Sequence, residues 1–120
     1  MQIIIANSSE RFDNIAFSNV VDDGKSLSLF SNYTCPKCKE NIGFTKNDFV
    51  ERSLKNFSNL SIEHQSLFNA SANDNQFNNF HFLDWYCPKC NLPVRVYIEH
   101  WVGGRHGDSG VNLKSVLELF

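Results

Sequence analysis

Apolar and polar residues alternate along several short stretches of the chain, and this two-residue period is typical of β-strands. The clearest stretch is 93–102, where Val94, Val96 and Ile98 share one face and polar or aromatic residues occupy the other. Shorter β-branched or aromatic runs predict further strands at 2–6, 15–21, 27–33 and 80–86. The pattern therefore indicates a protein built mainly from antiparallel strands.

Turn-forming residues separate these stretches. Residues 22–25 (Asp-Asp-Gly-Lys) lie between two predicted strands, and residues 103–110 form a glycine-rich segment that we expect to be a loop. A glycine-rich loop after a long strand is typical of a hairpin. We therefore expect residues 111–120 to return as a strand, with a short helix as the alternative.

The periodicity changes near residue 45. Thr45 and Asp48 have the spacing of a capping box, and apolar residues follow at helical intervals, which predicts a helix over 46–56. Residues 69–79 are nearly all Asn, Ser, Asp, Gln and Ala, a composition typical of an exposed loop. A helix and a loop therefore form an insertion at about 45–79.

The composition is that of a folded protein, with 42% hydrophobic residues and 11 phenylalanines. A length of 120 residues fits a single domain over residues 1–120. No run of 18 apolar residues is present, so we expect no association with a membrane. The first residues lack the basic and apolar regions of a signal peptide. We expect a cytoplasmic protein, in which cysteines stay reduced.

Four cysteines form two identical Cys-Pro-Lys-Cys segments, at Cys35, Cys38, Cys87 and Cys90. Two such pairs supply the four thiolates of a tetrahedral zinc site, and four protein ligands leave no position open for water or substrate. We therefore expect structural Zn²⁺ as the cofactor. Three alternatives are a redox-active Cys-Pro-x-Cys segment, a pair of disulfides, and a four-thiolate iron site.

The paired segments, each entered from an aromatic-rich predicted strand, resemble the zinc-ribbon family. The matching positions are the four cysteines, with Tyr33-Thr34 and Trp85-Tyr86 before them. The resemblance implies an α+β fold: a mainly antiparallel β-sheet zinc ribbon, with the metal between two knuckles. Here 48 residues separate Cys38 from Cys87, whereas about 15–20 is typical. The helix and loop are therefore inserted between the two knuckles.

The charge balance narrows the choice of function. The formal charge is −2, and four zinc-bound thiolates would bring it to −4. A small acidic domain without a catalytic constellation predicts a non-enzymatic protein-binding module. This profile fits an immunity or inhibitor protein that neutralises a bacterial toxin, because an acidic surface complements a basic toxin domain.

Arg, Tyr and Trp are enriched in interface hot spots. The candidate partner-binding residues on the strand at 93–102 and in the following loop are Arg95, Tyr97, Glu99, Trp101, Arg105 and His106. The alternative is that this strand face packs beneath the inserted helix, whose Phe49, Val50 and Leu54 need a cover.

A second function class is a nucleic-acid-binding zinc ribbon in transcription or RNA metabolism. Phosphate contacts would come from Lys37, Lys39, Lys89, Arg95 and Arg105. Bases would stack on Tyr86, Tyr97 or Trp101. The acidic charge balance speaks against this class.

A third hypothesis is an enzyme built on the glycine-rich loop, with Arg105 and His106 contacting phosphate. The segment 107–110 also resembles the sequence around the nucleophilic serine of trypsin-like proteases, which implies a nucleophilic Ser109. The chain is far too short for the double barrel of that family. We therefore expect a turn at 107–110 and no catalytic role.

Overall fold

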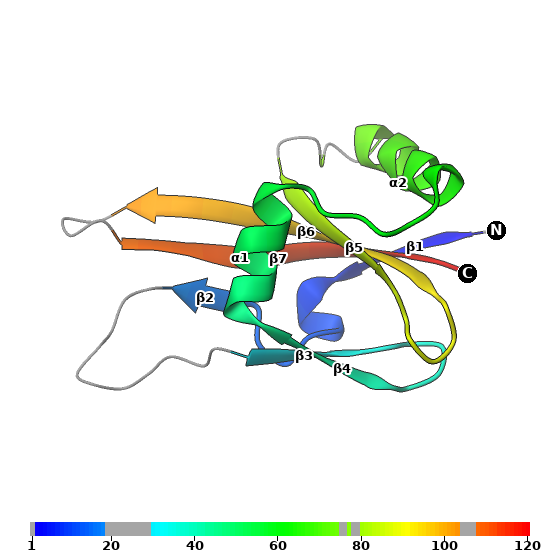
Figure 1. Cartoon of the computed structure of the whole chain (residues 1–120), viewed down its shortest axis with the longest axis horizontal. Coiled ribbons are helices and arrows are strands. Elements are labelled where there is room, and N and C mark those ends of the chain that lie inside the picture. The colour runs from blue at the N-terminus through cyan, green and yellow to red at the C-terminus, as the bar shows by residue number, and fades with distance from the viewer. Residues whose placement is uncertain (1, 19–29, 75–76, 78–79, 104–107) are drawn as a thin grey trace.

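The computed structural model describes residues 2–18, 30–74, 77, 80–103 and 108–120 (Figure 1). Its strands are β1 (Ile3–Asn7), β2 (Ala16–Ser18), β3 (Phe30–Thr34), β4 (Asn41–Thr45), β5 (His81–Tyr86), β6 (Pro93–Gly103) and β7 (Asp108–Leu119). Its helices are α1 (Lys46–Leu54) and α2 (Ile62–Asp74), and a 3-10 turn, η1 (Ser8–Glu10), follows β1. The α+β class is confirmed.

Strand β7 organises the main sheet. Five strands form this sheet in the order β1-β7-β6-β5, and β2 pairs with β7 beyond the end of β1. All of these pairings are antiparallel. Strands β3 and β4 form a separate two-stranded hairpin (Figure 1).

The strand predictions for 2–6, 80–86, 93–102 and 111–120 are confirmed. The prediction of a loop over 103–110 is wrong at its ends, because Asp108 to Gly110 pair with the end of β6 and belong to β7. Residues 104–107, the turn predicted at 22–25, and parts of the stretches 15–21 and 27–33 lie outside the described residues.

Helix α1 begins as the capping box predicts. The hydroxyl of Thr45 accepts from the N–H of Asp48 (3.2 Å), and the Asp48 carboxylate accepts from the N–H of Thr45 (2.8 Å). These reciprocal bonds satisfy two backbone donors at the helix start. Phe49 on the inner side of α1 is fully buried, so the cap fixes where this ring enters the core.

The exposed loop predicted at 69–79 is wrong for its first part, because α2 extends to Asp74. The hydroxyl of Ser61 accepts from the N–H of His64 (3.2 Å) at the helix start. Phe68 and Ala72 are buried on the inner side of the helix. Burial of an apolar stripe stabilises a helix more than intrinsic propensity does, so the Asn- and Ser-rich sequence is still helical.

The main sheet has a cover on each face (Figure 1). One face, which includes Val94, Val96 and Ile98, packs against α1 and the β3–β4 hairpin around a cluster of aromatic rings. On the other face, Tyr97 and Leu117 share a second core with Phe68 of α2 and Leu60. No helix in the described ranges is both long and apolar enough to cross a membrane.

Candidate metal centre

The two knuckles bring the four predicted cysteines together. Their sulfur atoms all lie within 4.8 Å of one another. Sulfurs of opposite knuckles lie 3.6 Å apart for Cys35 and Cys90 and 3.5 Å apart for Cys38 and Cys87. A tetrahedral ion with metal–sulfur bonds of about 2.3 Å places its sulfurs about 3.8 Å apart. The cluster therefore has the dimensions and donor atoms of a four-thiolate metal site.

The same backbone turn builds both knuckles. The N–H of Cys35 donates to the carbonyl five residues later (2.9 Å), and the Cys35 carbonyl accepts from the N–H of Lys39 (2.9 Å). The same two bonds recur at Cys87, at 2.9 and 2.8 Å, with Asn91 in place of Lys39. Lys39 and Asn91 have φ angles of 65° and 61°. This left-handed residue closes each turn and returns the chain alongside its entry strand.

Burial and backbone dipoles act differently on the two buried thiols. Burial raises the pKa of Cys35 to about 12. Burial also opposes ionisation of Cys87, but hydrogen bonds from the backbone N–H groups of Cys90 and Lys89, together with those from the Cys38 and Cys90 thiols, outweigh it and lower its pKa to about 7. Metal binding requires thiolates, and these backbone N–H groups favour that form at Cys87.

Three lysines belong to the two knuckles. Lys37, Lys39 and Lys89 are exposed, and the Lys89 ammonium lies 3.5 Å from the Glu40 carboxylate. Four thiolates and one divalent ion carry a net charge of −2, which these cations offset. The inner side of the cluster is apolar, because Cys35 and Cys87 belong to the aromatic core. The cluster therefore connects β3 and β5, the strands that lead into the two knuckles.

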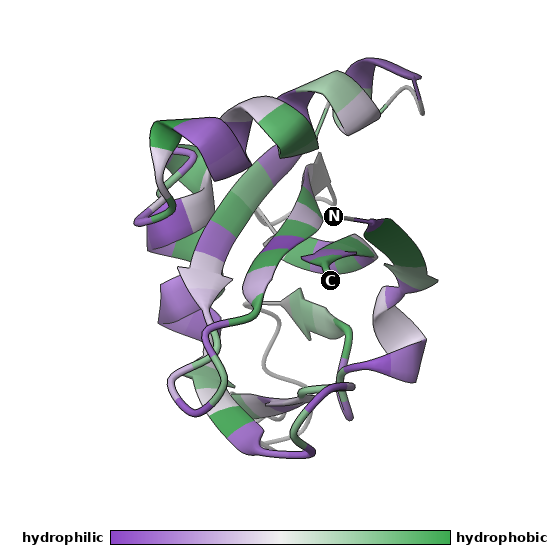
Figure 2. Cartoon of the chain, turned by 90° about the vertical axis from the view of Figure 1, so that its right-hand side faces the viewer, coloured by the Kyte–Doolittle hydropathy of each residue, from purple (hydrophilic) through white to green (hydrophobic). Residues whose placement is uncertain are grey.

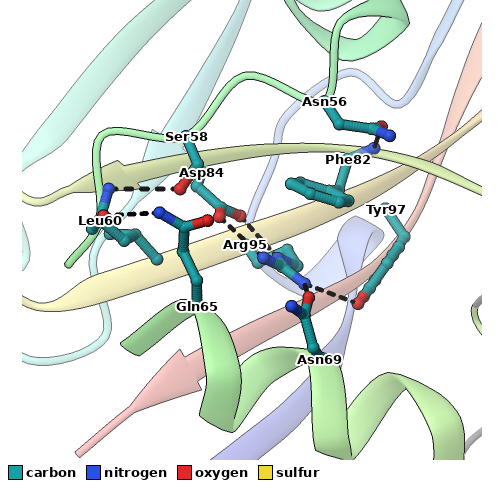
Figure 3. Close-up of polar contacts among 9 residues, drawn as sticks. All are labelled: Asn56, Ser58, Leu60, Gln65, Asn69, Phe82, Asp84, Arg95 and Tyr97. Atoms are coloured by element: carbon teal, nitrogen blue, oxygen red, sulfur yellow. Dashed lines mark hydrogen bonds and ion pairs between the residues drawn. The ribbon is translucent and has the colours of Figure 1, made fainter. Parts of the chain in front are cut away.

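The predicted partner-binding residues of β6 lie in two different environments, one buried and one partly accessible. Arg95 and Tyr97 are only 1% and 2% exposed. The Arg95 guanidinium donates to both carboxylate oxygens of Asp84 (2.7 and 2.9 Å) and to the side-chain oxygen of Asn69 on α2 (2.7 Å) (Figure 3). It also stacks on the Phe82 ring, 3.8 Å from its centroid. Neither side chain is accessible to a partner. The alternative prediction, that this strand face packs beneath a helix, therefore applies to these two residues, but the covering helix is α2 and not α1.

Glu99 and Trp101, further along β6, remain partly accessible. The Glu99 carboxylate lies 3.5 Å from the Lys114 ammonium. The Trp101 indole lies against Gly110 of β7. A side chain at position 110 would collide with it, because its Cβ would lie 2.5 Å from indole Cζ2. The candidates Arg105 and His106 lie outside the described residues.

Trp101 lines a groove that the sequence did not predict. The groove has a volume of about 340 Å³ and lies between α1 and the β6–β7 pair. Its apolar lining comes from Val50, Leu54, Trp101 and Val111, and His100 lies beside them. Leu54 is 55% exposed. The sequence does not indicate that Leu54 and Trp101 line the same groove, because their relative positions depend on how α1 crosses the sheet.

Two further polar connections, one at a buried glutamate and one at a half-buried histidine, had no signal in the sequence. Fully buried Glu118 on β7 accepts from Arg11 (2.8 Å) and from the hydroxyl of Tyr33 on β3. His100 on β6 contacts the hydroxyl of buried Ser53 on α1 (2.7 Å). Both connections attach an element of the covering layer to the main sheet.

Of the zinc-ribbon resemblance, the structure bears out the four-cysteine cluster on two similar knuckles. No protein-family model, curated protein or solved structure matches this chain.

Proposed function

We propose that this chain is a non-enzymatic protein-binding module held together by structural zinc. The observation that carries the proposal is the apolar groove lined by Val50, Leu54, Trp101 and Val111. Leu54 is exposed and Val50 and Trp101 are partly accessible in it, and exposed apolar surface is typical of a protein contact site. Trp101 is of the residue class that anchors interfaces.

The proposed metal is zinc because four thiolates at tetrahedral distances form its common structural site. A fourth protein ligand leaves no position for a substrate, so a role in catalysis is disfavoured. Its proposed role is to hold the β3–β4 hairpin, which leads directly into α1, to β5 of the main sheet. The groove would then depend on the metal indirectly, through the position of α1.

The proposed partner is a basic protein. The chain carries a formal charge of −2, and the zinc-bound cluster would bring it to −4. Opposite net charges accelerate and orient association. A basic toxin domain is such a partner, and the proposed role is then that of an immunity protein in the cytoplasm.

Nucleic-acid binding is the weaker candidate. Arg95 and Tyr97, two of the residues it would use, are buried. The exposed cations around the knuckles are Lys37, Lys39 and Lys89, and the last of these faces Glu40 at 3.5 Å. Of the cations that this hypothesis uses, Arg105 lies outside the described residues, so among the described ones only these three lysines would offset the overall negative charge.

Affinity purification from the native organism tests the groove directly. The baits are the zinc-loaded wild type, Leu54→Glu in the groove, and Ile62→Glu as the matched control. Ile62 is 83% exposed and does not line the groove. We expect one basic protein to be recovered with the wild type and with Ile62→Glu, and to be lost with Leu54→Glu.

Two results would contradict this proposal. One is recovery of the same protein with all three baits, which would place the contact outside the groove. The other is recovery of nucleic acid, with binding that weakens steeply as salt rises, which would favour the second candidate.

A further inference from the structure

Strand β1 lies at one margin of the main sheet and pairs with β7 on one side only. Gln2 and Phe120 exchange two hydrogen bonds of 2.8 Å, so they form a hydrogen-bonded pair. Hydrogen-bonded and non-hydrogen-bonded pairs alternate along an antiparallel ladder. It follows that the backbone of Ile4 bonds to β7, whereas the N–H and C=O groups of Ile3 and Ile5 point away from the sheet.

Described segments of the chain cover the opposite edge of this sheet, and none of them pairs with the β1 edge. On β5, the N–H of Asp84 donates to the carbonyl of Phe57 (2.9 Å), and a second edge N–H donates to the side chain of Asn56 (3.1 Å). Within the described residues, no hydrogen bond joins the outward groups of Ile3 or Ile5 to another segment. An unpaired strand edge is a template for a further strand.

The side chains of β1 do not protect this edge. Charged residues, prolines and bulges are the usual means of blocking an exposed edge. Residues 2–7 are Gln-Ile-Ile-Ile-Ala-Asn, without a charge or a proline, and their register with β7 is regular. Ile4 and Ile5 are 36% and 45% exposed. In Figure 2, β1 lies at the margin of the molecule in the colour of hydrophobic residues.

We propose that the outer edge of β1 pairs with the same edge of a second copy of this chain. The two strands run antiparallel about a twofold axis at Ile4. Ile3 then lies opposite the partner's Ile5, and each such pair exchanges two backbone hydrogen bonds. The two main sheets become one continuous sheet across the axis. This inference is independent of the groove and of the proposed function.

A second copy fits this edge for two reasons. First, a twofold axis places like against like, so isoleucine packs against isoleucine on both faces of the joined sheet. Ile3 and Ile5 lie on the α2 face, since Ile3 packs in the same core as Leu117. Second, the edge is uncharged, so pairing brings no like charges together at the contact.

The dimer should be weak and should depend on concentration. Only the five residues of β1 form the contact, and interfaces below about 1,200 Å² are typical of transient association. The assay is sedimentation equilibrium of the zinc-loaded chain from about 1 µM to about 1 mM, a range that covers weak affinities. We compare the wild type with Ile5→Lys and with Ile62→Lys, an exposed apolar residue away from this edge.

We expect the wild type and Ile62→Lys to dimerise alike and Ile5→Lys to raise the dissociation constant at least about tenfold, because it places two cations beside the axis. Hydrogen exchange supplies a second readout on the unmodified chain. The amides of Ile3 and Ile5 should become protected as concentration rises, whereas the Ile4 amide should be protected throughout.

Several outcomes would overturn the inference. A chain that stays monomeric over the whole range has no self-pairing edge. A dimer that Ile62→Lys weakens as strongly as Ile5→Lys forms through another surface. A dimer whose Ile3 and Ile5 amides exchange as fast as in the monomer does not use this edge.

Discussion

Replacing Asp84 by leucine should destabilise the protein severely, because it leaves the Arg95 guanidinium buried without a counter-ion. Both side chains are almost fully inaccessible, at 1% exposure for Arg95 and 0% for Asp84. Two hydrogen bonds of 2.7 and 2.9 Å join them. Removing one partner of such a pair costs about 3–5 kcal/mol. This loss is a large part of the free energy of unfolding of a typical domain, which is roughly 5–15 kcal/mol.

The reciprocal variant, Arg95→Met, should cost a similar amount, since it leaves the Asp84 carboxylate buried and unpaired. The double variant removes both charges, and replacing a buried pair by apolar residues is often close to neutral. The two single effects should therefore fail to add. We expect a coupling free energy of at least about 3 kcal/mol between the two positions.

The measurement is urea unfolding of the zinc-saturated proteins, analysed as a double-mutant cycle. The matched control is a cycle on Glu99→Leu and Lys114→Met, a pair that joins β6 and β7 at 3.5 Å. Its side chains are about two-fifths exposed, so its coupling should stay below about 1 kcal/mol. A coupling at Asp84 and Arg95 no larger than in this control would refute the reasoning.

Three further predictions concern the knuckles and α1. Cys38→Ser, or a chelator that removes the metal, should unfold much of the domain, as followed by circular dichroism; an unchanged melting temperature would show that the site is not structural. Lys39→Gly should stabilise the zinc-loaded protein by roughly 0.5–1 kcal/mol in urea unfolding, because Lys39 has a φ of 65°, a conformation that glycine adopts without strain. Asn91→Gly should have a smaller effect, because asparagine tolerates this conformation better than lysine does. Burial, together with the neighbouring His81, lowers the pKa of His100 below its usual value near 6.5, so the unfolded chain binds the additional proton. Stability should therefore fall as pH drops through about 6.5, and at saturating zinc the melting temperature of His100→Gln should fall less than that of the wild type; equal losses would contradict this assignment.

Local signals in the sequence were sufficient for much of this fold. The Thr45–Asp48 spacing located the start of α1, because both partners of a capping box lie within one turn. Alternation over 93–102 located β6 and separated its two faces. The repeated Cys-Pro-Lys-Cys segments identified the cysteine cluster, since each knuckle is a local turn. The capping box and each knuckle turn are local, whereas the meeting of the two knuckles was inferred from the need of one metal ion for four ligands.

The rest depends on contacts between distant segments. The Asn- and Ser-rich end of α2 is helical because Phe68 and Ala72 are buried in a core that they share with Tyr97 of another element. Arg95 was predicted to lie at an interface because its own segment does not show that it has a buried counter-ion. Asp84 comes to lie beside it only through the register of β5 against β6. The groove beside Trp101 depends on the path of α1 across the sheet. No pattern within one segment encodes these relationships.

The position of β7 in the sheet also has a consequence for synthesis. Strands β1 and β2 are made before β7, yet β7 is their hydrogen-bonding partner, and Ile3 lies opposite Leu119. Neither strand can join the main sheet until β7 has left the ribosome. Pairing over such sequence distances slows folding. Until then, each nascent chain carries the apolar Ile3–Ile5 segment without its native partner strand.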